Sequence, residues 1–247
     1  MLGVLFFVVA LLYASVGFGG GSSYLALLVL WQVPYAIIPA IALICNIVVV
    51  AGNSVHYARA GYINWRLLLP ITLASIPAAY FGGSLHIAKD IFVIILFVGL
   101  LATGVRLLIQ HRRYDDNLYS YKTIPLWLGI ILGATLGILA GITGIGGGIF
   151  LAPVLYHLRA GSPKQIAAAA SIFILLNSIS GILGQLQKSS FTDDILSYWY
   201  LPIMALIGGQ IGNLFAIKFA SARTISILTA ILILFVTGQL GMKILEG

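Results

Sequence analysis

Eight apolar segments alternate with short polar connections along the chain. They run over residues 2–30, 34–56, 65–85, 90–110, 125–157, 163–187, 195–217 and 222–243. A helix that crosses a lipid bilayer needs about 20 apolar residues, and each segment supplies roughly that number or more. The pattern predicts an all-α integral membrane protein with about eight transmembrane helices.

A polar stretch over residues 111–122 divides the segments four and four, and the two groups share features in the same order. We expect an N-terminal four-helix repeat over 1–110, a polar connecting loop over 111–124 and a C-terminal four-helix repeat over 125–247. The matching features are a glycine motif, then Pro34 and Pro163, Asn46 and Asn177, and Pro70 and Pro202. An even number of spans per copy predicts the same orientation for both copies, with a pseudo-twofold axis along the membrane normal.

The glycine motif opens each half, as Gly17-Phe18-Gly19-Gly20-Gly21 and as Gly144-Ile145-Gly146-Gly147-Gly148. Both segments that carry it are longer than one span needs, so we expect the first helix of each repeat to break there. A break exposes N–H groups and the positive end of the next helix dipole, so two breaks that face one cavity would bind an anion. The expected cradle comprises Gly19, Gly20, Gly21, Ser22, Gly146, Gly147 and Gly148.

Close helix packing is the alternative explanation for these glycines, because small residues four apart let membrane helices approach each other. This spacing occurs at Gly17 and Gly21, at Gly144 and Gly148, at Gly129 and Gly133, and at Gly137 and Gly141. The duplication, the triple glycine and the length of the two segments favour breaks at the first two pairs.

Composition supports the membrane class and excludes several functions. The chain is 61% hydrophobic and 8% charged, which is too few charges for a soluble enzyme or nucleic-acid binder. The net charge of +7 comes from residues scattered at segment ends. The tryptophans fall near the expected interfaces, as in an aromatic belt, at Trp31, Trp65, Trp127 and Trp199. With one cysteine and no metal-ligating cluster, no cofactor or metal is expected.

Positive charge gives an expected orientation. With eight full spans, the side of both termini would carry eight Lys and Arg residues, including Arg59 and Arg66. The other side would carry five, including Arg159 and Lys164. This excess predicts that both termini are cytoplasmic.

No acidic or basic residue lies in the middle of a segment, so a bound anion would be held by dipoles and hydrogen bonds. Asn46 and Asn177 are candidate contacts because they recur in the repeat, although membrane amides also join helices. His56 ends the second segment and is a candidate proton or anion contact, with an interfacial histidine as the alternative.

The stretches GFGGGSSYLALLVL and GITGIGGGIFLAPVL, one opening each half, resemble the sulfite exporter TauE/SafE family, also called the four-toluene-sulfonate uptake permeases. Residues 167–184 and 56–65 are similar to further family segments. The resemblance implies a multi-pass transporter in the cell (inner) membrane, an exporter of small sulfur-containing anions such as sulfite or organosulfonates. By position it implies a site at the six motif glycines with Asn46, Ser171 and Asn177. The first half departs from the family at Ala40-Ile41-Ala42-Leu43, which lacks a hydroxyl.

Two alternatives stay open from the sequence: an anion channel with the same site, and a structural membrane subunit that does not transport. No catalytic arrangement lies in the segments, so an enzyme is not expected. The expected partners are a small anion and the lipid bilayer, with no nucleic acid, and a homodimer is left open.

Overall fold

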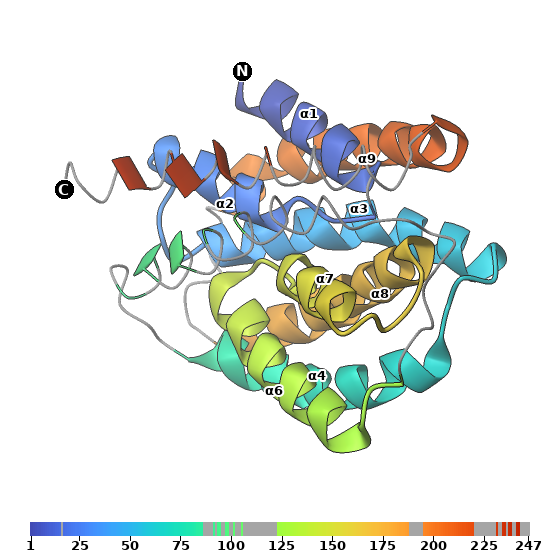
Figure 1. The fold of residues 1–247 in the computed structure, drawn as a ribbon. Helices are drawn as coiled ribbons and strands as arrows, with labels where there is room; N and C mark the ends of the chain where they lie inside the picture. Colours follow the sequence, from blue (N-terminus) through green and yellow to red (C-terminus); the bar gives the residue numbers. More distant parts are fainter. Residues whose placement is uncertain are drawn as a thin grey trace.

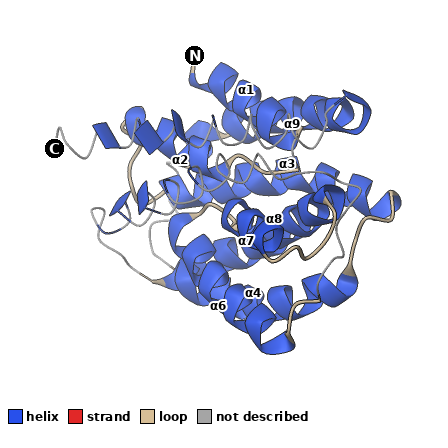
Figure 2. Cartoon of the chain, in the orientation of Figure 1, coloured by secondary structure: helices blue, strands red, loops and turns tan. Residues whose placement is uncertain are grey.

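The computed structural model describes residues 1–15, 17–85, 123–187 and 195–219, with isolated positions between 91 and 105 and between 231 and 242. Every regular element in these ranges is helical and none is a strand (Figure 2), which confirms the all-α class. The loop over 111–122 and most of the segments 90–110 and 222–243 lie outside the described residues. The predicted number of helices and the domain limits therefore stay predictions.

The described elements follow the predicted segments closely. They are α1 (Leu2–Ala14), α2 (Gly21–Leu30), α3 (Ile38–Arg59), α4 (Trp65–Ser84), α6 (Leu126–Thr143), α7 (Gly148–His157), α8 (Pro163–Gln185), the short 3₁₀ helix η2 (Leu196–Tyr198) and α9 (Tyr200–Phe219). Among them, α3, α4, α6 and α8 are long and apolar enough to cross a membrane. This fits the predicted helical membrane protein.

The helices pack in layers, with α1 and α9 on one side, α3 and α8 in the centre, and α4 and α6 on the other side (Figure 1). Glycines four residues apart make the outer contacts. A Cβ atom at Gly133 or Gly141 of α6 would overlap the backbone carbonyls of α4, and one at Gly208 or Gly212 of α9 would overlap those of α1. The packing explanation therefore holds for the glycines of α6 between residues 129 and 141.

The two central helices are antiparallel. Leu43, near the start of α3, lies against Gly181, near the end of α8, with 3.3 Å between Leu43 Cδ1 and a Cβ built on Gly181. At the other end, Lys164 Nζ donates a hydrogen bond of 3.2 Å to Tyr62 Oη. The end of α3 and the start of α8 therefore lie together. We call this the basic end (residues 59–66 and 157–164) and its opposite the distal end (residues 30–38 and 84–85).

The broken segment 125–157 is a hairpin that begins and ends at the basic end. Helix α6 runs parallel to α4, because Gly129 lies against Pro70 at the start of α4 and Gly141 lies against Ala79 and Gly83 near its end. Since α4 starts at the basic end, α6 does too. Helix α7 then returns to the basic end, where α8 begins only six residues after α7 ends.

The broken segment 2–30 is a hairpin of the opposite sense. Helix α1 ends toward the basic end, because a Cβ on Gly17 would lie 3.0 Å from Tyr57 Oη and 3.1 Å from Ala167 Cβ. Helix α2 then leads back to the distal end, where α3 begins, and the N-terminus lies at this same end (Figure 1). The two hairpins thus enter from opposite ends, as in inverted repeats.

This arrangement corrects the prediction that both halves have the same orientation. A helix pair joined at a glycine break has the same apolar length whether it crosses the membrane or turns back, so apolar length alone does not give the direction of a segment. The orientation argument fails with it, because Arg59 and Arg66 share the basic end with Arg159 and Lys164. The predicted interfacial tryptophans are exposed at helix ends, with Trp65 and Trp127 at the basic end, Trp31 at the distal end and Trp199 next to the start of α9.

Single-cysteine labelling tests the hairpins. In a Cys45→Ala background, we expect Gly61→Cys and His157→Cys to react with an impermeant maleimide from one side of the membrane, and Ala36→Cys from the other. All three positions are exposed. Eight full spans would instead place residues 61 and 157 on opposite sides, so labelling of that pair from opposite sides would reject the hairpins.

Candidate site at the two glycine breaks

Both glycine motifs interrupt helices, between α1 and α2 and between α6 and α7. The backbone is left-handed at Gly17 (φ +84°), Gly20 (φ +92°), Gly144 (φ +76°), Gly146 (φ +81°) and Gly147 (φ +78°). Only glycine adopts this conformation without steric cost. The triple glycines therefore form the tips of the hairpins, as the sequence predicts for broken helices.

Helices α2 and α7 begin at these tips without side-chain caps. Their N-cap residues are Gly20 and Gly147, and residues 19–23 and 145–149 are buried. Within the described part of the chain, the N–H groups of Gly21 and Gly148 have no hydrogen-bond partner. Uncapped first-turn N–H groups carry the partial positive charge of the helix dipole. Two such ends lie in the interior, where an anion would supply the missing acceptors.

The central helices hold each other's breaks. Asn46 of α3 donates from Nδ2 to Ile145 O at 3.0 Å and to Gly144 O at 3.4 Å. Ser171 of α8 donates from Oγ to Gly17 O at 2.6 Å. Each half therefore positions the hairpin tip of the other half.

Asn46 also explains why glycines stand opposite it. A Cβ on Gly19 would overlap Asn46 Oδ1, and one on Gly21 would lie 2.6 Å from Asn46 Nδ2 and 2.8 Å from Ile145 O. The two tips thus approach each other through Asn46, which is fully buried.

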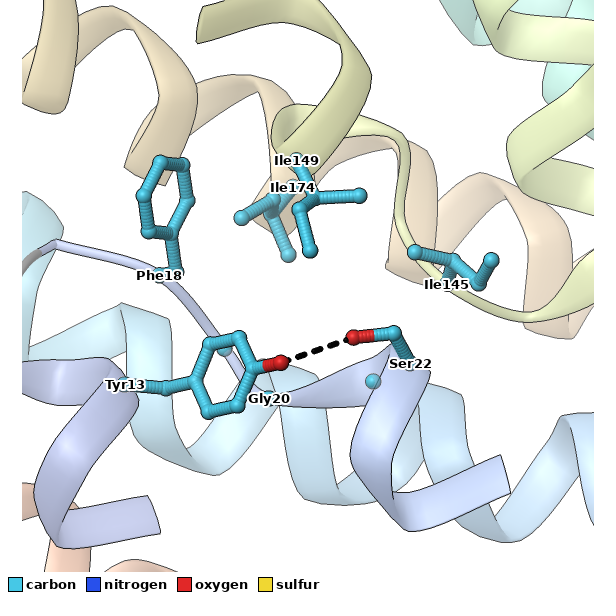
Figure 3. Close-up of a pocket in the computed structure, with 9 residues that line it drawn as sticks. Tyr13, Phe18, Gly20, Ser22, Ile145, Ile149 and Ile174 are labelled. Carbon is cyan, nitrogen blue, oxygen red and sulfur yellow. Dashed lines mark hydrogen bonds between the residues drawn. The ribbon is translucent and has the colours of Figure 1, made fainter. Parts of the chain in front are cut away.

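A small cavity lies between the tips (Figure 3). The first half contributes Tyr13, Phe18, Gly19, Gly20, Gly21 and Ser22, and the second contributes Ile145, Ile149 and Ile174. The centre of a water molecule can occupy about 10 Å³ of it, room for about one water. Tyr13 Oη lies 3.0 Å from Ser22 Oγ and 3.0 Å from Ser23 Oγ. One wall therefore carries hydroxyl and N–H groups, and the facing wall is isoleucine.

The predicted site residues fall into three groups. Gly19, Gly20, Gly21 and Ser22 line the cavity, whereas Gly146, Gly147 and Gly148 form the second tip and start of α7. Asn46 and Ser171 hold the tips. Asn177 donates to Phe173 O in its own helix at 2.8 Å, and its buried Oδ1 has no hydrogen-bond partner among the described residues. His56 is half-buried near the basic end, ten residues from Asn46, or about 15 Å along α3.

Sequence reasoning missed the apolar and aromatic lining: Tyr13, Phe18, Ile145, Ile149 and Ile174. Only glycines and polar side chains were considered as anion contacts, because isoleucine is common in every apolar segment. A signal existed for two of them. When the motifs are aligned, Ile149 occupies the place of Ser22, and Tyr13 corresponds to Ala140. The alignment of the two motifs therefore indicates that the two halves contribute different side chains, polar in the first half and apolar in the second.

Metal chemistry has no support among the described residues, which contain no group of three or more His, Cys, Asp or Glu side chains that could hold an ion. The site in the described part of the chain consists of backbone dipoles, hydroxyls and amides. Such groups bind anions without fixed charge.

The sequence profile described as sulfite exporter TauE/SafE matches residues 2–240. The chain belongs to this family. Its curated relatives bear transporter names, which fits the membrane helices.

The matches cover most of this chain and most of each relative. One is the probable membrane transporter protein y4hK of Sinorhizobium fredii, 32% identical over 235 residues, which are 94% of each chain. Another is the probable membrane transporter protein MJ0441 of Methanocaldococcus jannaschii, 29% identical over 195 residues, 74% of this chain and 71% of the relative. A third, from Haemophilus influenzae, is 26% identical over 190 residues, 74% of this chain and 70% of the relative. No solved structure matches the chain.

Proposed function

We propose that this protein exports a small sulfur-containing anion, such as sulfite or an organosulfonate, and that the anion binds between the two hairpin tips. The observation that carries the proposal is the pair of buried, uncapped helix starts at Gly20 and Gly147. The family description supplies the class of anion. The protein acts as a transporter rather than an enzyme.

Neutral groups suit a substrate that must leave again. The backbone N–H groups of the first tip and the hydroxyls of Tyr13 and Ser22 are the donors that line the cavity, and the start of α7 adds N–H groups close by. They stabilise an anion without the deep trap that a buried lysine or arginine would create. The facing isoleucines, Ile145, Ile149 and Ile174, give an organic substituent an apolar surface.

The size of the cavity favours a carrier over an open channel. A space that holds about one water cannot hold a sulfite ion, which has four heavy atoms. The tips must separate before an anion binds, so access is coupled to movement of the hairpins. Because the hairpins enter from opposite ends, opening one tip exposes the site to one side and opening the other exposes it to the opposite side.

We also infer that the basic end faces the cytoplasm. The Lys and Arg side chains that the structure describes, Arg59, Arg66, Arg159 and Lys164, all belong to this end. Positive charge is retained on the cytoplasmic side of membrane proteins. The N-terminus would then lie outside, and on intact cells the maleimide would label Ala36→Cys but not Gly61→Cys.

Flux through purified protein tests the function. We expect proteoliposomes containing the full chain to release labelled sulfite or methanesulfonate faster than empty liposomes, and external unlabelled anion to stimulate the release by exchange. A channel would conduct without exchange stimulation. The absence of flux for sulfite, sulfate, thiosulfate and small sulfonates alike, at several pH values and potentials, would reject transport of this class and favour a structural subunit.

A further inference from the structure

A basic and aromatic cluster at the basic end has no role in the site between the tips. It consists of Lys164 in the first turn of α8, Tyr62 in the α3–α4 connection and Tyr57 in the last turn of α3. Lys164 Nζ donates to Tyr62 Oη at 3.2 Å and lies 5.1 Å from the centre of the Tyr62 ring. The rings of Tyr57 and Tyr62 meet edge to face, with centres 6.5 Å apart.

The backbone fixes the cluster in place. Ser162 Oγ accepts from Gln165 N at 3.3 Å and Gln165 Oε1 accepts from Ser162 N at 2.9 Å, a capping box that sets the first turn of α8 around Lys164. Gly61 turns the chain with φ +72°, and Tyr62 N donates to Tyr57 O at 3.1 Å. Tyr62 is therefore folded back between Tyr57 and Lys164.

The cluster leads inward to the first hairpin tip. Tyr57 Oη lies 3.0 Å from where a Cβ of Gly17 would be, and Gly17 O accepts the hydrogen bond from Ser171. Ala167, one turn after Lys164, contacts the same glycine, with 3.1 Å between its Cβ and the Gly17 position. Lys164 contacts Tyr62, Tyr62 contacts Tyr57, and Tyr57 contacts the Gly17 position, so these side chains connect the exposed lysine to the tip.

The chemistry of the cluster suits an oxyanion. Lys164 is exposed, and its described hydrogen-bond partner is a phenol rather than a carboxylate. No Asp or Glu occurs among the described residues, so no described carboxylate neutralises the ammonium. Tyr57 Oη has no hydrogen-bond partner among them either. An ammonium and two phenols give several donors in one place, and the tyrosine rings give an apolar surface beside them.

We propose that Lys164, Tyr62 and Tyr57 form an outer binding site for small oxyanions of the sulfonate and sulfite type. The three side chains hold the anion before it passes to the tip at Gly17. The class of anion rests on the proposed function. The site itself is separate from the cavity between the tips.

Transport kinetics test the role of the lysine. In proteoliposomes, Lys164→Gln is expected to raise the KM for methanesulfonate about fivefold, the scale of one exposed ionic contact, while Vmax stays within about twofold. Lys164→Arg retains the charge and should restore most of the affinity. The matched control is Arg66→Gln, which removes an exposed cation at the same end. Added salt should slow wild-type flux at low substrate more than it slows Lys164→Gln.

Chemical protection tests binding without transport. Acetylation of Lys164 by an N-hydroxysuccinimide ester, followed by mass spectrometry, should slow severalfold with millimolar methanesulfonate, and Tyr62→Phe should weaken the protection. A lipid phosphate has the same oxyanion chemistry, so nanodiscs of phosphatidylcholine and of phosphatidylglycerol are compared. Protection that follows the lipid instead of the dissolved anion overturns the proposal.

The two proposals fail in different ways. Protection of Lys164 without flux through the wild-type protein supports the outer site and rejects the transport function. Normal wild-type flux, no protection, and equal kinetics for Lys164→Gln and Arg66→Gln reject the outer site alone. A purely structural Lys164–Tyr62 contact predicts a lower Vmax with unchanged KM and salt dependence, which also rejects it.

Discussion

Leucine at both Gly20 and Gly147 is expected to abolish anion flux while the chain still inserts into the membrane. The two glycines have left-handed backbone, with φ +92° and +78°, which a leucine resists. A Cβ would also lie 3.0 Å from Val9 Cγ1 at Gly20 and 2.8 Å from Phe173 Cε1 at Gly147, so each side chain would displace a hairpin tip. The measurements are methanesulfonate flux in proteoliposomes and the amount of chain in the membrane fraction.

Gly61→Leu separates the strain from the site. Gly61 has φ +72° and nothing within 4 Å of a Cβ atom, so leucine there meets the same backbone cost without crowding. It should retain flux close to wild type at saturating anion, and an effect on the turn that places Tyr62 would appear only as a higher KM. Normal flux in the Gly20→Leu/Gly147→Leu variant would show that the tips are not the binding place.

Asn46→Asp is expected to lower flux at least about 100-fold, because a like charge beside a bound anion costs several kcal/mol. The substitution keeps the shape of the side chain but replaces the amide donor to Ile145 O and Gly144 O with an acceptor. Two carbonyls would then face a carboxylate, and the second tip would lose its support. Initial rates of labelled methanesulfonate release measure the effect, with thermal unfolding in detergent as a check on folding.

Asn64→Asp is the matched change outside the site. Asn64 caps α4 through its Oδ1, which accepts from Leu67 N at 3.4 Å, and aspartate performs the same role well. We expect flux and stability close to wild type. Equal activity of the Asn46→Asp and Asn64→Asp variants would mean that Asn46 neither supports the tip nor lies beside the substrate.

The helix breaks were predictable because glycine has a distinctive conformational range. Consecutive glycines in an overlong apolar segment indicate irregular backbone, and residues 17–20 and 144–147 have it. The recurrence of Asn46 also pointed to a residue near the breaks. The sequence could not show that Asn46 reaches the tip of the other half while Asn177 bonds within its own helix, because both sit at matching positions.

The direction of each segment was not predictable from apolar length. Ten residues in α2 or α7 are too few to span a bilayer, yet added to α1 or α6 they read as one long span. Contacts distant in sequence, such as Lys164 with Tyr62, decide the direction. The three isoleucines that line the cavity, Ile145, Ile149 and Ile174, could not be predicted for a similar reason. Isoleucine is common in any apolar segment, and only the packing of the helices shows which isoleucines reach the cavity.

The glycine-mediated contacts of α6 with α4 and of α9 with α1 affect how the hairpins can move. At Gly133, Gly137 and Gly141 of α6, and at Gly208 and Gly212 of α9, the glycine backbone lies directly against backbone carbonyls of the neighbouring helix, with no large side chain between them. A helix that contacts its neighbour through glycines has few large side chains in the way of a small lengthwise shift, and such shifts between packed helices are called shear motion. Each hairpin thus has close backbone contacts along one arm, α1 or α6, and hydrogen bonds at its tip, so a lengthwise shift of that arm requires the polar contacts at the tip to break.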